Sequence, residues 1–378
     1  MSRPAAVIVL AAGEGTRMKS GTPKVLHKIC GESMLGLVLA TAREVDPERL
    51  IVVVGHQRRQ VTEFLLSQAP DATAVVQHRQ GGTGHAVRTA IEAVGLDHGT
   101  IVVTYADAPL LRGETLAALI REHWAEEAAA TALTARLADP TGYGRIIRDD
   151  AGAFMEIIEE ADATPEQRAI QEINSGVYAF EAHLLGDVIK RVPTDNAKGE
   201  EYLTDVVAIL RAEGQRVASV LLEDPDEVLG VNDRAQLARA RQILNTRLLG
   251  GWMRAGVTIV DPGTTWIDTG VTLAADVEIG PDTQLEGGTT IAAGARVGPA
   301  CLLRDTSVGA GAIVTHAVCQ SAQIGAGATV GPFAYLPPGS KLDAGAHAGS
   351  RSAVAADGVA GEDVAAHGTA TSEGAWDA

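Results

Sequence analysis

A glycine-containing loop near the N-terminus carries two cations at fixed distances. The strand-like run Ala6–Leu10 leads into the loop Ala11–Gly15, and Arg17 and Lys24 follow it. Backbone N–H groups of such a loop, at the carboxyl end of a parallel strand, can approach phosphates closely, and the two cations could neutralise a triphosphate. The spacing matches neither GxxxxGKS/T nor GxGxxG, which disfavours a P-loop ATPase and a dinucleotide-binding dehydrogenase.

A single carboxylate follows another predicted strand. Asp107 comes shortly after the run Val102–Thr104, and an Asp at this place is either a turn cap or a ligand for Mg²⁺. Asn232 precedes a helix-like stretch, so the sequence alone favours a helix N-cap there.

Composition narrows the classes of function. The 378 residues contain 31 Lys and Arg against 48 Asp and Glu, for a formal net charge of -17. Phosphate polymers and anionic membranes would be repelled, so we expect neither a nucleic-acid partner nor a membrane partner. A hydrophobic content of 46% excludes general disorder. No apolar run predicts a signal peptide or a membrane span, and we therefore expect a cytoplasmic protein.

Residues 1–231 alternate short β-branched runs with helix-like stretches. The strand-like runs are Ala6–Leu10, Leu50–Gly55 and Val102–Thr104, and the helix-like stretches are Met34–Arg43, Gln60–Ser67 and Gly113–Glu127. This α/β order predicts a mostly parallel sheet covered by helices. Residues 232–255 lack Pro and are rich in Ala, Leu and Arg, and they predict a linker helix.

From about residue 256, apolar residues recur at every sixth position. The repeat comprises Ile267, Leu273, Ile279, Leu285, Ile291, Val297 and Leu303, and after a break Val318, Ile324, Val330 and Leu336. This period predicts a left-handed parallel β-helix over 256–342, whose coils of three hexapeptides turn these residues inward. The Ala- and Gly-rich segment 343–378 has little to bury and is expected to form a frayed tail.

The three cysteines, Cys30, Cys301 and Cys319, are far apart in the sequence and have no CxxC or His-rich neighbours. This spacing argues against a disulfide framework and a structural zinc site. We expect small buried hydrophobes at these positions.

The N-terminal loop extends into a longer pattern that resembles a known family. LAAGEGTRMKSGTPKVLHKI is similar to the motif of sugar-1-phosphate nucleotidylyltransferases. More narrowly, it resembles the bifunctional N-acetylglucosamine-1-phosphate uridylyltransferase/glucosamine-1-phosphate acetyltransferase family. Further matches, in the same order and together spanning roughly residues 5–340, are Gln77, Gly82–Ala86, Ala106–Leu110, Thr141–Ile146, Ile158–Glu159, Asn174–Tyr178, Tyr202–Asp205 and Gly230–Asn232.

The resemblance implies a Rossmann-like mixed sheet followed by a short left-handed β-helix, and a reaction between UTP and a sugar 1-phosphate. The sugar phosphate attacks the α-phosphorus in line and pyrophosphate leaves, so catalysis is positioning and charge neutralisation. It implies Mg²⁺ bound by Asp107 and Asn232. Arg17 would stabilise the leaving pyrophosphate, and Lys24 would bridge the α-phosphate or the sugar phosphate. The attacking oxygen is already ionised, so we expect His85 to serve the start of a helix rather than as a base.

The resemblance also assigns residues to each substrate. The nucleotide-binding residues are Leu10, Ala11, Ala12, Gly13, Gly15, Gln77, Gly82 and Thr83, of which Gln77 and Gly82 would recognise the uracil edge. The residues expected to bind the sugar phosphate are Tyr105, Ala106, Gly144, Glu159 and Asn174. Glu159 lies in the acidic run EIIEEAD, so a solvated surface carboxylate is the competing interpretation. For the assembly, the family implies a homo-oligomer, with a trimer of β-helices favoured.

Several positions depart from the family pattern. Ala106 replaces the usual Gly before the metal-binding Asp, and Lys198 replaces a Gln. The turn Leu336–Gly339 lacks the family's Arg, the Lys-Asn pair falls on Ala355-Ala356, and His367 has no Tyr three residues later. The remaining coils of the acetyltransferase part are absent. We therefore expect acetyl transfer to be lost.

Three hypotheses follow. The leading one is a Mg²⁺-dependent enzyme that joins UTP and N-acetylglucosamine 1-phosphate. The second keeps this chemistry with another sugar or cyclitol 1-phosphate, or another nucleoside triphosphate, in a specialised pathway. Ala106, Lys198 and the expected loss of acetyl transfer favour it. The third is a non-catalytic nucleotide-sugar sensor or structural oligomer. Against the third stands the joint presence of the four predicted catalytic and metal-binding residues.

Overall fold

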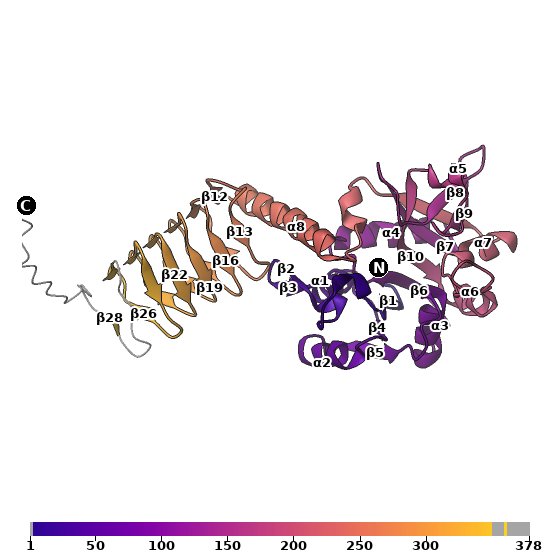
Figure 1. Ribbon diagram of the computed structural model, residues 1–378, viewed down its shortest axis with the longest axis horizontal. Coiled ribbons are helices and arrows are strands. Elements are labelled where there is room, and N and C mark those ends of the chain that lie inside the picture. The colour runs from indigo at the N-terminus through magenta and orange to yellow at the C-terminus, as the bar shows by residue number, and fades with distance from the viewer. Residues whose placement is uncertain (1–2, 350–358, 361–378) are drawn as a thin grey trace, which may run out of the picture. The chain divides into compact units, whose positions relative to one another are not determined.

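The computed structural model describes residues 3–349 and 359–360, and the chain divides into two compact units (Figure 1). The first unit comprises Met1–Lys28 and Ser33–Ala240, and the second comprises Ile29–Glu32 and Arg241–Ala378. Helix α8 (Arg234–Arg254) crosses the division between them.

The first unit is built on a nine-stranded mixed sheet whose main path runs β11-β7-β10-β6-β1-β4-β5. Its strands are β1 (Ala6–Ala11), β4 (Leu50–Val54), β5 (Ala72–Val76), β6 (Thr100–Tyr105), β7 (Ala130–Arg136), β8 (Arg145–Arg148), β9 (Phe154–Ile158), β10 (Glu172–Glu181) and β11 (Val217–Leu221). Strands β4, β1 and β6 are parallel neighbours, and β10 runs antiparallel to β6 and β7. The carboxyl ends of β1 and β6 therefore lie side by side, where parallel sheets bind ligands.

Helices cover both faces of this sheet and bury every side chain of the inner strand β1. Val7 and Val9 of β1 join one apolar cluster with α1 (Met34–Arg43), α2 (Arg58–Gln68) and α4 (Gly113–Ala125). The alternate residues, Ile8 and Leu10, join a second cluster with three further helices. Those helices are α3 (Thr83–Val94), α6 (Ala182–Val188) and α7 (Asp205–Ala212). A strand buried on both faces reads as a continuous apolar run, which is the pattern of Ala6–Leu10 in the sequence.

Short elements connect these layers. They are η1 (Thr16–Met18), η2 (Lys24–Leu26), β2 (Lys28–Ile29), β3 (Glu32–Ser33), α5 (Pro165–Arg168), η3 (Ile189–Arg191) and η4 (Pro225–Val228). Within the described residues, no helix combines the length and the apolar character that crossing a bilayer requires.

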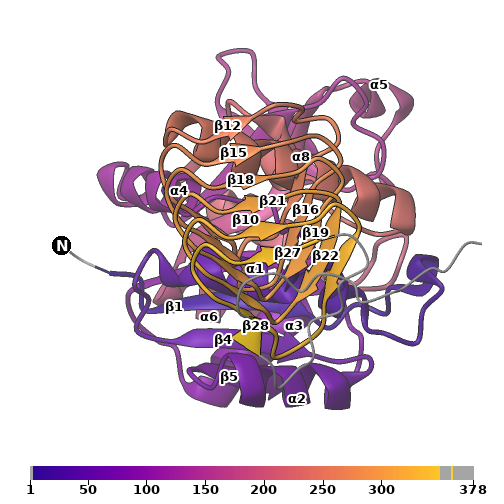
Figure 2. The same cartoon turned by 90° about the vertical axis from the view of Figure 1, so that its left-hand side faces the viewer.

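The second unit is a parallel β-helix of three sheets, whose short strands stack in Figure 1; Figure 2 looks nearly along this stack, so that the coils appear as overlapping loops. The first sheet contains β12 (Thr258–Ile259), β15 (Glu278–Ile279), β18 (Arg296–Val297), β21 (Ile313–Val314), β24 (Thr329–Val330) and β27 (His347–Ala348). The second contains β13 (Trp266–Ile267), β16 (Gln284–Glu286), β19 (Leu302–Arg304), β22 (Ala317–Gln320) and β25 (Ala334–Leu336). The third contains β14 (Thr272–Leu273), β17 (Thr290–Ile291), β20 (Ser307–Val308), β23 (Gln323–Ile324), β26 (Lys341–Leu342) and β28 (Val359–Ala360). The predicted fold class, a Rossmann-like mixed sheet followed by a left-handed parallel β-helix, is confirmed.

The break in the hexapeptide period changes which residues face inward. Val308 and Cys319 occupy inward positions, whereas Val318 is 37% exposed, so the expectation that Val318 faces the core is wrong. The coils here are shorter: Leu303 pairs with Cys319, whereas Leu285 pairs with Leu303. A one-residue change in register exchanges the two faces of a strand. Counting six residues back from Ile324 therefore gives Val318, whereas the inward residue is its neighbour Cys319.

The coils also continue beyond residue 342, the predicted end of the β-helix. Strand β27 pairs in parallel with β24, and Ala348 is fully buried opposite Val330. A methyl group suffices at this inward position, so a search for bulky apolar residues misses it. Residues 350–358 and 361–378 of the expected tail lie outside the described residues.

The cysteines behave as expected. All three are buried and free, and burial raises the pKa of the Cys30 and Cys319 thiols to about 12. A thiol with such a pKa is not a nucleophile near neutral pH.

Candidate active site

The loop after β1 is shaped to hold Lys24. Gly15 has φ +62°, and a Cβ built on it would lie 2.6 Å from the Cβ of Lys24. Any larger residue at position 15 would displace Lys24, which begins the short helix η2. The glycine of this motif therefore positions the cation as well as giving the loop its left-handed turn.

Lys24 lies between the two residues expected to bind Mg²⁺. Its ammonium forms an ion pair with the Asp107 carboxylate and donates a hydrogen bond of 3.1 Å to the Asn232 side-chain oxygen. The backbone N–H of Val231 donates to the Asp107 carbonyl at 2.8 Å, which fixes Asn232 beside the end of β6. Three residues that are far apart in the sequence thus form one polar cluster, Lys24–Asp107–Asn232.

The donor chemistry of this cluster fits Mg²⁺. A carboxylate and an amide oxygen are hard ligands, and Mg²⁺ characteristically uses one or two protein carboxylates together with substrate phosphates and water. Among the described residues, no group of three or more His, Cys, Asp or Glu comes together as a dedicated metal cage. Asp107 and Asn232 would hold the ion, and the Lys24 ammonium lies beside both of them.

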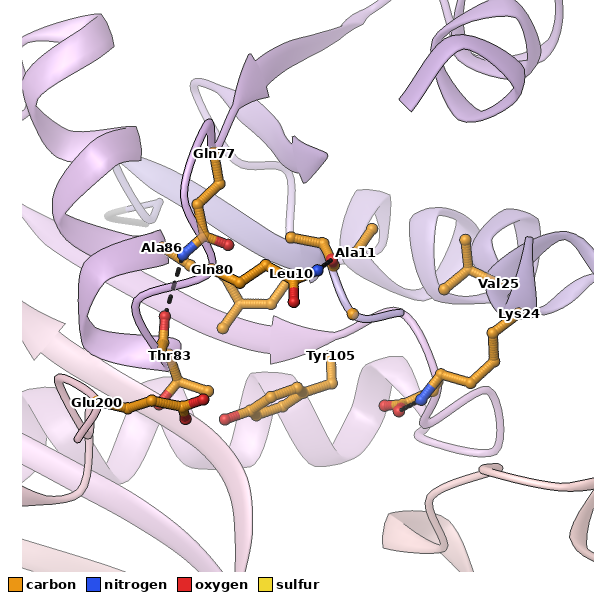
Figure 3. A pocket seen from close by; sticks show the side chains of 14 residues that line it. Leu10, Ala11, Lys24, Val25, Gln77, Gln80, Thr83, Ala86, Tyr105 and Glu200 are labelled. Atoms are coloured by element: carbon orange, nitrogen blue, oxygen red, sulfur yellow. Dashed lines mark hydrogen bonds and ion pairs between the residues drawn. The ribbon is translucent and has the colours of Figure 1, made fainter. Parts of the chain in front are cut away.

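A cavity of about 260 Å³ connects this cluster to the first turn of α3. It is lined by Leu10, Ala11, Ala12, Gly13, Lys24, Val25, Gln77, Gln80, Gly82, Thr83, Ala86, Tyr105, Asp107 and Glu200. Figure 3 shows Gln77, Thr83 and Glu200 entering from one side and Lys24 from the other, with Tyr105 between them. The cavity thus has one end with the Gln77 amide, the Thr83 hydroxyl and the Glu200 carboxylate, called the amide-lined end below, and another end with the Lys24–Asp107 ion pair.

At the amide-lined end, Gly82 precedes α3 in a conformation that other residues avoid. Its φ is +99° and its ψ is 179°, and an added Cβ would lie 2.5 Å from the carbonyl oxygen of Glu201. Thr83 accepts a hydrogen bond of 3.1 Å from the N–H of Leu203. The segment 200–203 therefore closes this end of the cavity by direct contact with Gly82 and Thr83.

We expect Gly82→Ala to lower the free energy of unfolding by about 2–3 kcal/mol and to weaken nucleotide binding, because backbone strain adds to the clash with Glu201. Urea denaturation and nucleotide titration would measure both effects. Gly95→Ala is the matched control, since Gly95 ends α3 with φ +65° but faces open space. Equal losses in the two variants would contradict the role of the Glu201 contact.

Several predicted sugar-phosphate residues lie beside the cavity rather than in its lining. Asn174 is buried and accepts hydrogen bonds from the Tyr178 hydroxyl at 2.8 Å and from the Gly176 N–H at 3.1 Å. The backbone N–H of Asn174 donates to the Gly144 carbonyl at 2.9 Å, so Asn174 and Gly144 are neighbours.

Tyr105, in contrast, lines the cavity. Burial raises the pKa of its phenol, which therefore remains a hydrogen-bond donor near neutral pH.

Glu159 is not a freely solvated carboxylate. It accepts a hydrogen bond of 3.2 Å from the Thr204 hydroxyl, and burial is the main cause that raises the pKa of its carboxyl group. It lines a second cavity together with Tyr202 and Asp205. Lys198 is close to this cavity, with its ammonium 6.0 Å from the centre of the Tyr202 ring.

Ala106 and Arg17 lie apart from the cavity lining. Ala106 is fully buried in the apolar cluster beneath α1 and α4, so the core accommodates its extra methyl group. Arg17 lies on η1 with an exposed side chain, and no contact within the described part of the chain fixes its guanidinium. Its role at the leaving pyrophosphate stays a prediction.

Sequence reasoning missed four lining residues, Val25, Gln80, Ala86 and Glu200. Gln80 donates a hydrogen bond of 3.2 Å to the Ala12 carbonyl and thereby ties the segment before α3 to the loop after β1. Val25 and Ala86 lie within or next to the quoted motifs, and their position there was the only available signal. Glu200 lies in the segment that contains Lys198, but nothing in its residue type pointed to this cavity.

Comparisons with known proteins identify the family of the chain. A family model described as a MobA-like NTP transferase domain matches residues 7–173. The bifunctional protein GlmU of Streptomyces avermitilis is 55% identical over 350 residues, which cover 92% of this chain and 73% of that protein. GlmU of Thermobifida fusca is 58% identical over 328 residues, which cover 86% of this chain and 68% of that protein. The chain therefore belongs to the bifunctional uridylyltransferase/acetyltransferase family of the GlmU proteins and is an enzyme of the sugar-1-phosphate nucleotidylyltransferase type.

Proposed function

We propose that this enzyme transfers the uridylyl group of UTP to N-acetylglucosamine 1-phosphate, giving UDP-N-acetylglucosamine and pyrophosphate in a Mg²⁺-dependent reaction. The observation that carries the proposal is one continuous cavity with Gln77 and Gly82 at one end and Lys24 and Asp107 at the other. The base of a nucleoside triphosphate requires hydrogen-bonding groups at one end of a site, and its triphosphate requires charged groups at the other end.

The reaction forms a bond between a phosphate oxygen of the sugar 1-phosphate and the α-phosphorus, and it breaks the bond from the α-phosphorus to the bridging oxygen of pyrophosphate. The attacking oxygen carries negative charge already, so the chain needs no general base and no nucleophile of its own. Lys24 neutralises charge that builds up on the α-phosphate as the two phosphates approach. Bound Mg²⁺ would supply further charge neutralisation and hold the triphosphate in line.

The substrates are tested by measuring pyrophosphate release over a matrix of nucleoside triphosphates and sugar 1-phosphates. We expect the highest kcat/KM for UTP with N-acetylglucosamine 1-phosphate. A second candidate is the same reaction with a different sugar or cyclitol 1-phosphate, and Lys198 near the Tyr202 ring favours it because it changes the charge beside Glu159. A preference for another sugar phosphate would select this candidate. Nucleotide binding without turnover across the matrix would instead indicate a non-catalytic sensor.

We also propose that the chain does not transfer acetyl groups. The turn Leu336–Gly339 lacks the arginine of the family pattern, and Ala355-Ala356 replace the family's Lys-Asn pair. The positions 355, 356 and 367 lie outside the described residues. Incubation with acetyl-CoA and glucosamine 1-phosphate should release no free CoA thiol, and release at a rate comparable to nucleotidyl transfer would overturn the proposal.

The assembly that we propose is a homotrimer of β-helices. Adjacent coils expose Val318, Phe333 and Tyr335, with Phe333 70% exposed, and exposed apolar patches mark interaction sites. We expect sedimentation equilibrium to give three times the mass of one chain, and Phe333→Asp to shift the protein to monomer. Leu66→Asp is the control, because Leu66 is 73% exposed on α2 in the other unit and should leave the trimer intact. A monomeric wild type would contradict the proposal.

A further inference from the structure

The side chain expected to recognise the base is held by a histidine from the neighbouring helix. The Gln77 amide nitrogen lies 3.1 Å from the Gly82 carbonyl oxygen and 2.9 Å from Nδ1 of His85. Figure 3 shows the first of these contacts as the dashed line from Gln77. His85 lies in the first turn of α3.

The chemistry of these contacts determines the orientation of the amide. A carbonyl oxygen can only accept, so the Gln77 atom that faces Gly82 is the NH₂ group. The same NH₂ group approaches Nδ1 of His85, so Nδ1 must be an unprotonated acceptor and the ring a neutral Nε2–H tautomer. The two acceptors use both amide hydrogens. Oε1 of Gln77, which has no partner within the described part of the chain, is left as the group that faces a ligand.

The surroundings of His85 keep its ring in place and neutral. Its ring packs on Gly81, where an added Cβ would lie 3.0 Å from the ring carbon Cγ. The amino end of a helix disfavours a positive charge. The charged groups around the ring are Arg79, Arg88, Glu92 and Glu201. Arg88 binds Glu201 through hydrogen bonds of 2.8 and 3.1 Å, so these two charges largely offset each other. Burial is the main cause that lowers the pKa of the His85 ring.

We propose that His85 is a positioning residue for base selection, which holds the Gln77 amide with its oxygen toward the nucleotide and so favours uracil over cytosine. This inference rests on the proposed reaction with UTP and identifies what sets its nucleotide specificity. Uracil presents a donor at N3, which an amide oxygen can accept, whereas cytosine presents an unprotonated acceptor at N3. An amide free to rotate could present its NH₂ group to cytosine instead.

Protonation of His85 should weaken this preference for uracil over cytosine. The imidazolium carries a hydrogen on Nδ1, which then needs an acceptor and competes for Oε1 of Gln77. The amide can satisfy that hydrogen only by turning its NH₂ group toward the nucleotide. UTP binding should therefore weaken as the pH falls through the pKa of His85, and discrimination against CTP should weaken with it.

Three variants test the proposal through KM and kcat for UTP and CTP, measured from about pH 5.5 to about pH 8.5, the range in which histidine titrates. His85→Ala should raise the KM for UTP roughly three- to tenfold, the effect of one lost hydrogen bond, with little change in kcat. It should also narrow the preference for UTP over CTP. His85→Asn places an amide oxygen near the position of Nδ1 without a titrating group. It should restore the UTP preference and remove the dependence on His85 protonation. The ratio of wild-type to Asn-variant KM at each pH cancels the titration of UTP itself. His98→Ala, at a solvent-exposed histidine, is the control.

The outcomes separate this inference from the proposed function. If wild-type enzyme uses no UTP, the proposed function fails. If it uses UTP and His85→Ala keeps the wild-type KM and the wild-type preference over CTP, only the role of His85 is overturned. A fall in kcat and stability alone, which His85→Asn does not restore, would also overturn it, because that pattern indicates a merely structural contact.

Discussion

We expect Asp107→Asn to lower kcat/KM for nucleotidyl transfer by about 10³-fold or more, the scale that applies when preorganised charge stabilisation is removed from a reaction centre. The substitution keeps the shape of the side chain but removes the charge that would bind Mg²⁺. Asp107 lies just beyond the end of β6, beside Lys24 and Asn232. Without its charge, the cluster contains two amide side chains and an ammonium that has no ion-pair partner in it. Steady-state kinetics over a range of Mg²⁺ concentrations measure the effect, and we expect higher Mg²⁺ to recover only part of the rate.

The fold should survive this substitution. The side chains of Lys24 and Asp107 are 11% and 21% exposed, and partly solvated ion pairs contribute about 1 kcal/mol or less. Asp150→Asn, in the exposed turn between β8 and β9, is the matched control and should retain wild-type kinetics. If kcat/KM of the Asp107→Asn enzyme stayed within a few-fold of wild type, as for an ordinary surface substitution, Asp107 would be a structural cap and not a metal ligand.

Lys24→Ala should lower kcat/KM by about 10²–10³-fold, mostly through kcat, because the ammonium acts on charge that develops during transfer. Lys24 is held by Gly15 on one side and by Asp107 and Asn232 on the other, which fixes its ammonium at one end of the cavity. Pre-steady-state measurement of pyrophosphate release separates this effect on chemistry from an effect on binding.

The control for Lys24 is Lys190→Ala, which removes an exposed lysine from η3 and should change nothing. The double variant of Lys24 and Asp107 should lose less than the product of the two single losses, because residues that act as a unit are not additive. A strictly multiplicative loss would contradict a shared site.

The architecture was predictable where the local sequence period is strong. The buried run of β1 and the helix α1 appear in the sequence with almost the bounds that the structure has. The hexapeptide period predicted the β-helix because each hexapeptide contributes one inward apolar residue, which can be recognised within the hexapeptide itself. That logic failed at Val318 and at Ala348, since a shortened coil and a small inward side chain leave no trace in a search for bulky residues at fixed spacing.

The site was predictable in its residue types but not in its contacts. The motif around Lys24 and the position of Asp107 after a strand pointed to phosphate and metal chemistry. That Lys24 bridges Asp107 and Asn232 depends on how three loops meet at one sheet edge, which no local pattern encodes. His85 was expected only to begin a helix, because its contact with Gln77 arises from the fold of the intervening loop.

The most direct test of the central claim is a single product analysis. Wild-type protein with Mg²⁺, UTP and N-acetylglucosamine 1-phosphate should form UDP-N-acetylglucosamine and pyrophosphate in equal amounts, and chelation of Mg²⁺ should stop both. Binding of UTP without release of pyrophosphate, for this sugar phosphate and for every other one in the matrix, would contradict the assignment of nucleotidyl transfer to the cavity between Gln77 and Asp107.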